Sequence, residues 1–303
     1  PYFGTVEKPE CHMLYNVTTM ATIWNTVAAK DIRLLRRQMD IVYSLPKEYT
    51  FLNYLRCHDD IGWGLDYGVL KEWGMNEIPH KRFLNDYFTG KLEGSVSRGE
   101  LYNDDPVSCD ARFCGTTASM CGIESAEYEK NPDKLDEAVR LDLMLHALIL
   151  CQPGIPMLYS GDEVGQVNDY SYKEDPEKAS DSRYIHRGKF NWELAEKRGE
   201  RGSMQEKIFH GITRLEEIRK SEKVFDSTAE IYTYDVHNDS VLCIMRRTER
   251  ETFFGIFNFS GQDETAWMKE EGEFTDLLTG AKITLDNLRI PGQSFYWIKG
   301  RRS

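Results

Sequence analysis

The segment richest in chemically active side chains is residues 56–63, which reads Arg-Cys-His-Asp-Asp-Ile-Gly-Trp. It sets His58 beside the two carboxylates of Asp59 and Asp60. Carboxylates accept hydrogen bonds from vicinal hydroxyls, a histidine donates or accepts, and an indole face stacks on a sugar ring. A carboxylate can also stabilise an oxocarbenium-like transition state. The segment is therefore suited to a polyol such as a sugar, although capping and turn residues at the start of a loop have the same composition.

Two further polar segments carry arginines that can contact a substrate. Residues 181–187 contain Arg183, which can pair with a substrate-binding carboxylate and keep it ionised. Residues 109–116 contain Arg112. For both segments the alternative is a surface loop with an ordinary ion pair. The acidic pair at residues 162–163 is compatible with catalysis, but acidic residues also suit the start of a helix.

Composition and charge restrict the class of partner. The 303 residues carry a formal net charge of −12, and 40% of them are hydrophobic. An acidic chain without a basic stripe is a poor partner for nucleic acid or for an anionic membrane surface. No apolar run approaches the roughly 18 residues that a membrane helix needs. The sequence contains no phosphate-binding loop, dinucleotide-binding turn or nucleophile elbow. We therefore expect a neutral substrate and no cofactor.

The seven cysteines are irregularly spaced, and no two of them form a C-x-x-C pair. This pattern argues against a zinc ribbon or a dithiol redox motif. The sequence also has no loop of oxygen ligands that would indicate calcium. We therefore expect reduced thiols in a cytoplasmic protein, and no metal site.

The hydrophobic pattern alternates between short apolar runs and helical stripes. Strands are expected at residues 11–16, 50–56 and 154–159, and helices at residues 19–42, 135–150 and 204–219. The stretch at about residues 61–134 is rich in Gly, Asn and Asp and has one expected helix, at about residues 81–88. Strand-like runs then follow at residues 231–234, 241–245, 253–257 and 294–298.

This order sets an alternating part before an all-β part. Alternation implies parallel strands joined by right-handed helical crossovers. Two of the strands end in polar clusters, and α/β folds keep their active sites at the carboxyl ends of the strands. We therefore predict an α/β domain over residues 1–220, with a long insertion at about residues 61–134. An antiparallel β-domain is predicted over residues 221–303.

At these residues the sequence resembles the α-amylase superfamily of glycoside hydrolases, most closely its amylosucrase and sucrose hydrolase branch. Residues 53–63, Asn-Tyr-Leu-Arg-Cys-His-Asp-Asp-Ile-Gly-Trp, resemble the fourth signature region of that family. Residues 154–163 match its last barrel strand, G-x-P-x-x-Y-x-G-x-E. The segments around Arg112 and Arg183 are also similar to amylosucrases, so the resemblance covers essentially the whole chain.

The resemblance implies a role for each of five residues. His58 and Asp59 would bind the glucosyl ring of the donor, with Asp59 as the carboxylate that stabilises the transition state. Asp60 would contact the same site and Arg183 would line it. Arg112 would lie towards the acceptor. The implied substrate is sucrose or an α-glucan.

The resemblance also implies what this sequence lacks. The family uses a retaining double displacement, which needs an Asp nucleophile and a Glu acid/base. It carries both on barrel strands that precede the segment matching residues 1–4. The resemblance therefore predicts a partial (β/α)8 TIM barrel, made of its last three βα units, followed by a C-terminal antiparallel β-sandwich. The expected activity is that of a C-terminal portion of a hydrolase or glucosyltransferase, inactive by itself.

An alternative function is a non-catalytic remnant that binds carbohydrate or complements a separate chain. An incomplete barrel exposes unpaired strand edges. These edges predict self-association or an N-terminal partner chain.

Overall fold

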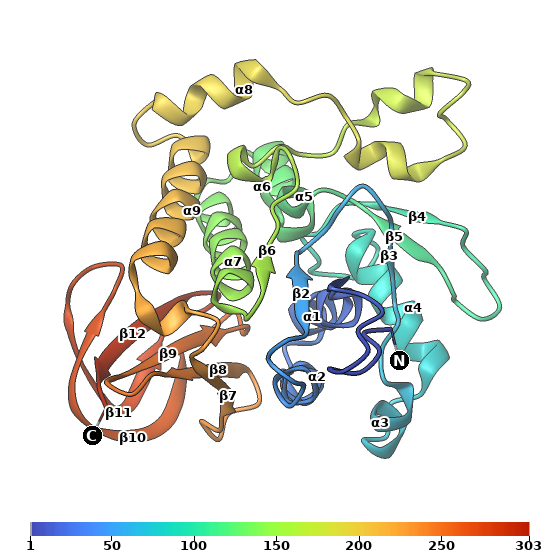
Figure 1. The fold of residues 1–303 in the computed structure, drawn as a ribbon. Coiled ribbons are helices and arrows are strands. Elements are labelled where there is room, and N and C mark those ends of the chain that lie inside the picture. Colours follow the sequence, from blue (N-terminus) through green and yellow to red (C-terminus); the bar gives the residue numbers. More distant parts are fainter. Residues whose placement is uncertain (1, 303) are drawn as a thin grey trace.

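The computed structural model describes residues 2–302. Three short parallel strands form one sheet. They are β1 (Met13–Tyr15), β2 (Thr50–Asn53) and β6 (Ile155–Pro156), in the order β1-β2-β6. Both pairings are parallel. Two of the strands, β2 and β6, lie near the centre of Figure 1. All three predicted strands are present, although each is shorter than its apolar run. Because the strands are parallel neighbours, the chain segments that follow β2 and β6 leave the sheet at the same end, the carboxyl end of the strands.

The first helical stretch is two helices, whereas the apolar spacing predicted one. Helix α1 (Val17–Ala29) ends where Lys30 adopts a left-handed φ of 58°. Helix α2 (Arg33–Tyr43) begins after Asp31, whose carboxylate accepts a hydrogen bond from the Arg33 backbone N–H at 2.9 Å. The stripe of apolar residues runs through both helices, so hydrophobic period alone did not reveal the break.

Helix α1 holds the chain that leaves β2. Trp24 is fully buried, and its indole N–H donates to the Leu55 carbonyl at 2.7 Å. The ring also meets Phe88 edge to face, with 5.9 Å between the ring centroids. The indole therefore fixes the backbone just before the polar segment at residues 56–63.

The two long helices confirm the predicted helices at residues 135–150 and 204–219. Helix α7 (Pro132–Cys151) is capped by Asn131, and helix α9 (Met204–Ser221) by Ser203. Both caps accept backbone N–H groups of the first turn, which would otherwise lack partners. The two helices share an apolar cluster that includes Val139 and Ile212.

The insertion after β2 is more ordered than the sequence predicted. Its strands form a small antiparallel sheet in the order β3-β5-β4. Helix α4 confirms the expected helix near residues 81–88, and the other elements are too short to show a period. The elements are β3 (Ile61–Gly62), α3 (Tyr67–Glu72), α4 (Glu77–Phe88), β4 (Glu100–Tyr102), β5 (Arg112–Cys114), α5 (Thr117–Cys121) and α6 (Ile123–Glu129).

The segment between β6 and α9 contains one short α-helix and several 3-10 turns. The sequence predicted no elements there, because 3-10 turns of three to five residues carry no hydrophobic stripe. These elements are η1 (Asp162–Val164), η2 (Tyr170–Glu174), η3 (Ser182–His186), α8 (Trp192–Glu196) and η4 (Lys197–Gly199). A last turn, η5 (Lys223–Phe225), follows α9.

The C-terminal part is one antiparallel sheet in the order β11-β10-β12-β9-β8-β7 (Figure 1). The sequence pattern predicted an antiparallel β-domain, and the family resemblance implied a β-sandwich. In the structure, β10 and β11 contribute to the same apolar cluster as β8 and β9, so this ribbon packs over its own sheet. The strands are β7 (Glu230–Tyr234), β8 (Val241–Arg247), β9 (Glu251–Asn258), β10 (Glu264–Asp276), β11 (Lys282–Ile290) and β12 (Phe295–Arg301).

A buried guanidinium joins this sheet to the α/β part. Arg246 of β8 is 1% exposed and donates to the carbonyls of Val224, Cys151 and Asp226 at 2.6, 2.9 and 3.1 Å. The carbonyl of Cys151 belongs to the last turn of α7, where a cation is favourable.

Among residues 2–302, no helix combines the length and the apolar character needed to cross a bilayer.

Candidate functional site

A buried ion pair lies beneath the predicted site. Arg56, just after β2, contacts Oδ1 of Asp162, just after β6, through Nε at 2.8 Å and Nη2 at 2.7 Å. Both side chains are 3% exposed or less. The hydroxyl of Thr117 donates to the other carboxylate oxygen at 3.1 Å. The guanidinium lies 4.5 Å from the ring centre of Tyr159. Asp162 therefore joins the chain segments after β2 and β6, and its carboxylate is committed to this contact.

His58 and Asp59 lie above this pair in an open position. Their side chains are 63% and 57% exposed, and His58 Nε2 is 3.4 Å from Asp59 Oδ2. Arg187 donates from Nε to the His58 carbonyl at 2.6 Å, and its Nη2 is 3.7 Å from Asp59 Oδ1. Arg187 therefore fixes the backbone of this turn, while one face of the carboxylate stays accessible.

Asp60 and Arg112 form a second contact at this edge. Arg112 Nη1 donates to Asp60 Oδ2 at 3.3 Å, with the carboxylate mostly covered and the guanidinium half exposed. The pairing of β3 with β5 brings them together, because Gly62 lies opposite Arg112 in the register. The two residues that were predicted on separate segments are therefore neighbours, and Arg112 lies on the solvent side.

Arg183 pairs within its own segment. It donates from Nε and Nη2 to the two oxygens of Asp181 at 2.8 and 2.7 Å, and it stacks 4.6 Å above the ring of Tyr102. Hydrogen bonds from this guanidinium lower the pKa of Asp181, and the carboxylate raises the pKa of Arg183. Arg183 therefore keeps Asp181 ionised. In this structure its bidentate partner is Asp181, whereas Asp60 acts on it only through charge.

His186 was part of a predicted segment but had no assigned role. Its Nδ1 accepts the Gly115 backbone N–H at 3.1 Å, so Nε2 carries the proton and faces the His58 carbonyl at 3.3 Å. Burial, aided by the charge of Arg56, lowers the pKa of His186 to about 4. A neutral imidazole therefore links the insertion to the turn that carries His58.

The indole that sequence analysis offered as a sugar platform is in the core. Trp63 is 4% exposed, its N–H donates to the Asn85 side chain at 2.9 Å, and it stacks on Phe88 at 5.4 Å. This corrects the idea that its face stacks on a substrate. Sequence reasoning also missed Arg187. Its only signal was a second cation in the segment already chosen for Arg183.

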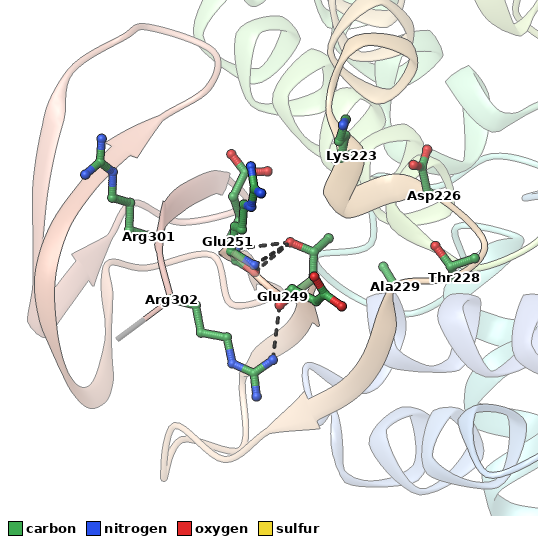
Figure 2. A pocket seen from close by; sticks show the side chains of 10 residues that line it. Lys223, Asp226, Thr228, Ala229, Glu249, Glu251, Arg301 and Arg302 are labelled. Atoms are coloured by element: carbon green, nitrogen blue, oxygen red, sulfur yellow. Dashed lines mark hydrogen bonds between the residues drawn. The ribbon is translucent and has the colours of Figure 1, made fainter.

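A large hollow on the surface involves none of the predicted site residues. It has a volume of about 1080 Å³ and lies between η5, the β8–β9 turn and the last strand (Figure 2). Arg302 donates there to the Thr248 carbonyl at 3.1 Å. Its lining mixes basic and acidic side chains, so it offers no uniform charge to a ligand. The residues are Lys223, Asp226, Thr228, Ala229, Thr248, Glu249, Arg250, Glu251, Arg301 and Arg302.

No family model matches the chain. The curated relatives include the glucosylglycerate phosphorylase of Escherichia coli, which is 24% identical over 263 residues. This match covers 86% of the chain and 43% of the relative, so the chain spans less than half of that protein. A glucosylglycerate phosphorylase of Spirochaeta thermophila is 24% identical over 254 residues, covering 83% of the chain and 39% of the relative.

Solved structures share the fold at lower identity. The crystal structure of sucrose 6F-phosphate phosphorylase from Thermoanaerobacter thermosaccharolyticum has a TM-score of 0.60 at 16% identity, covering 92% of this chain and 47% of that one. The crystal structure of AmyP in complex with maltose has a TM-score of 0.60 at 15% identity, covering 98% and 51%. These likenesses show that the chain shares the fold of the two solved structures.

The buried ion pair predicts an asymmetric response to mutation. Arg56→Met should lower the free energy of unfolding by about 3–5 kcal/mol, because the Asp162 carboxylate is left buried without its partner. Adding Asp162→Leu should recover most of this loss, since both charges are then gone. Urea unfolding measures both variants. The control is Arg289→Met, which breaks an exposed ion pair and should cost less than about 1 kcal/mol. A double variant as unstable as the single one would show that the instability does not come from the unpaired Asp162 carboxylate.

The neutral His186 predicts a pH-dependent stability. The unfolded imidazole binds a proton below its ordinary pKa of 6.5, whereas the folded one does so only near 4. The unfolded state therefore binds more protons between these values, and this group makes stability fall as pH drops from 6.5 to 4, by up to about 3 kcal/mol. In His186→Asn the amide oxygen can replace Nδ1 as the acceptor. This variant should lose the part of the pH dependence of the free energy of unfolding that His186 contributes, as measured by urea unfolding at several pH values. Equal pH dependence in wild type and His186→Asn would refute the assignment.

Proposed function

We propose that this chain carries the part of an α-glucoside-processing enzyme that binds the donor sugar. The observation that carries the proposal is the exposed pair of His58 and Asp59 at the carboxyl end of β2. A glucosyl ring needs acceptors for its hydroxyl protons and a negative charge near its anomeric centre in the transition state. The curated relatives act on glucosylglycerate, and AmyP was solved with maltose, which supports an α-glucoside as the substrate class.

Asp59 is the proposed transition-state carboxylate, with His58 as its partner on the ring. Arg187 supports this role because it holds the backbone of the turn and leaves Asp59 Oδ2 open. Asp60 is proposed as a second contact with the sugar, and Arg183 as a residue that lines the pocket. Arg112 is proposed on the acceptor side, since it is half exposed beside Asp60.

The parallel strands β1, β2 and β6 are proposed to be the last three strands of a (β/α)8 barrel. Their order and direction support this, as does the β-sheet that follows them. The proposed division is a barrel part over residues 1–220 and a β-domain over residues 221–303. The nucleophile and the acid/base are proposed to belong to the part of the relatives that this chain does not span. Without them, the polypeptide of residues 1–303 binds the donor but does not cleave it.

The transferred glucosyl group has three possible acceptors in this proposal. Sequence resemblance to amylosucrases suggests water or a sugar. The curated relatives are phosphorylases, which adds inorganic phosphate.

The seven cysteines are all free thiols, which supports the proposed cytoplasmic location.

The proposal predicts binding without turnover. Isothermal titration of residues 1–303 with maltose and sucrose should detect weak binding, and Asp59→Asn should weaken it about ten-fold, since a charged hydrogen bond contributes about 1.5–3 kcal/mol. Neither sugar should release glucose, fructose or glucose 1-phosphate, with or without phosphate.

The matched control is Asp286→Asn, an exposed carboxylate on β11, which should bind like wild type. Turnover by this polypeptide would overturn the assignment of the missing groups. Binding that is equal in Asp59→Asn and wild type would overturn the sugar site itself.

We also propose that the parallel sheet associates with another polypeptide segment. Within residues 2–302, β1 and β6 each have one strand neighbour only. Apolar side chains at these edges are exposed, including Met13, Tyr15 and Ile155. An edge of this kind is a ready template for further strand pairing.

Association predicts a concentration-dependent mass. Sedimentation velocity of residues 1–303 should show a species heavier than the 35.2 kDa monomer as concentration rises. Tyr15→Lys with Ile155→Lys should return the monomer, because charges on an edge oppose pairing. Val107→Lys changes an exposed apolar residue away from the sheet and should not. A wild-type monomer at every concentration would exclude self-association.

A further inference from the structure

Three different metal-ligand atoms meet at the turn after β2. The Cys57 thiol, the His58 imidazole and the Asp59 carboxylate each offer one ligand atom, and these atoms all lie within 4.8 Å of one another. Sequence analysis expected no metal site, because the sequence has no C-x-x-C pair and no loop of oxygen ligands. The turn itself brings these three side chains to one side.

The distances fit one ion. Zinc bonds nitrogen at about 2.0–2.1 Å and oxygen at about 2.0–2.2 Å in a tetrahedral arrangement, so its nitrogen and oxygen ligands are about 3.4 Å apart. His58 Nε2 and Asp59 Oδ2 are 3.4 Å apart. The thiolate of Cys57 would complete a three-ligand set, and the exposure of the other two side chains leaves the fourth position to solvent.

The surroundings orient the ligands. Asp59 directs Oδ1 towards Arg187 at 3.7 Å, which leaves Oδ2 for a cation on the His58 side. The backbone N–H of Asp59 donates to Cys57 Sγ at 3.4 Å and orients the sulfur, while burial keeps the pKa of this thiol above its ordinary value. Supporting contacts of this kind hold ligands in place in known metal sites. A sulfur, nitrogen and oxygen set selects zinc over calcium or magnesium, which take oxygen ligands.

We propose that Cys57, His58 and Asp59 form a Zn²⁺ site with one open coordination position. Binding releases the thiol proton of Cys57. Because the ion takes side-chain atoms of His58 and Asp59, metal and sugar exclude one another. This exclusion rests on the proposed function, whereas metal binding does not.

The test is a titration of reduced residues 1–303 with Zn²⁺ alone. One ion should bind per chain, and Cys57→Ser should weaken binding about 100-fold. Co²⁺ should give a thiolate-to-cobalt charge-transfer band that is absent from Cys57→Ser. His58→Ala should weaken binding without removing this band. Cys11→Ser is the matched control, because its half-buried thiol is not part of the trio and should leave both signals unchanged.

Equal zinc affinity in Cys57→Ser and wild type, or loss of the signals in Cys11→Ser, would overturn the site. Circular dichroism of each variant separates lost ligands from lost folding. A titration in the presence of maltose then tests the exclusion. Zinc binding that maltose does not weaken would contradict the shared site, and the direct titration reports separately on the metal.

Discussion

The arrangement of the site depends on one buried contact, the ion pair between Arg56 and Asp162. It bridges the carboxyl ends of β2 and β6. Arg56 follows β2 in the chain, and Asp162 follows β6. Removing two charges from water is costly unless every remaining donor and acceptor finds a partner. The Thr117 hydroxyl donates to the second oxygen of the Asp162 carboxylate, and the carbonyl of His186 lies 3.4 Å from Arg56 Nη1. Four chain segments thus converge on one pair of charges.

This convergence explains why the open residues of the site lie together. Arg56 immediately precedes the turn of Cys57, His58 and Asp59, so anchoring the guanidinium fixes where the turn begins. His186 reaches the same turn from the other side through the His58 carbonyl, and Arg187 donates to that carbonyl as well. The buried charged and hydrogen-bonding groups beneath the turn contact one another and hold the chain segments together. The imidazole of His58 and Oδ2 of Asp59 remain outside that network, whereas Oδ1 of Asp59 faces Arg187.

The sequence predicted those features that local pattern controls. Trp24 lies on the apolar stripe of its helix, and the strands before residues 57 and 160 end in polar clusters, as expected of an α/β fold. The break at Lys30 was not predictable, because it depends on one backbone angle and on one hydrogen bond from the Arg33 backbone N–H to the Asp31 carboxylate. Strands β10 and β11 were missed for another reason. Their charged residues face solvent on a ribbon whose apolar face packs only on its own sheet.

The site shows the same division between local and long-range information. Asp60 and Arg112 were selected by residue type, but their contact follows from a pairing of strands about 50 residues apart in the chain. Trp63 has the right chemistry for a sugar and the wrong environment, because the aromatic cluster of the insertion encloses it. Residue type therefore indicated which groups can do chemistry, while tertiary contacts decided which of them solvent can reach. Cys57, His58 and Asp59 are adjacent in sequence, and the turn that presents them begins at the buried Arg56, which a tertiary contact with Asp162 anchors.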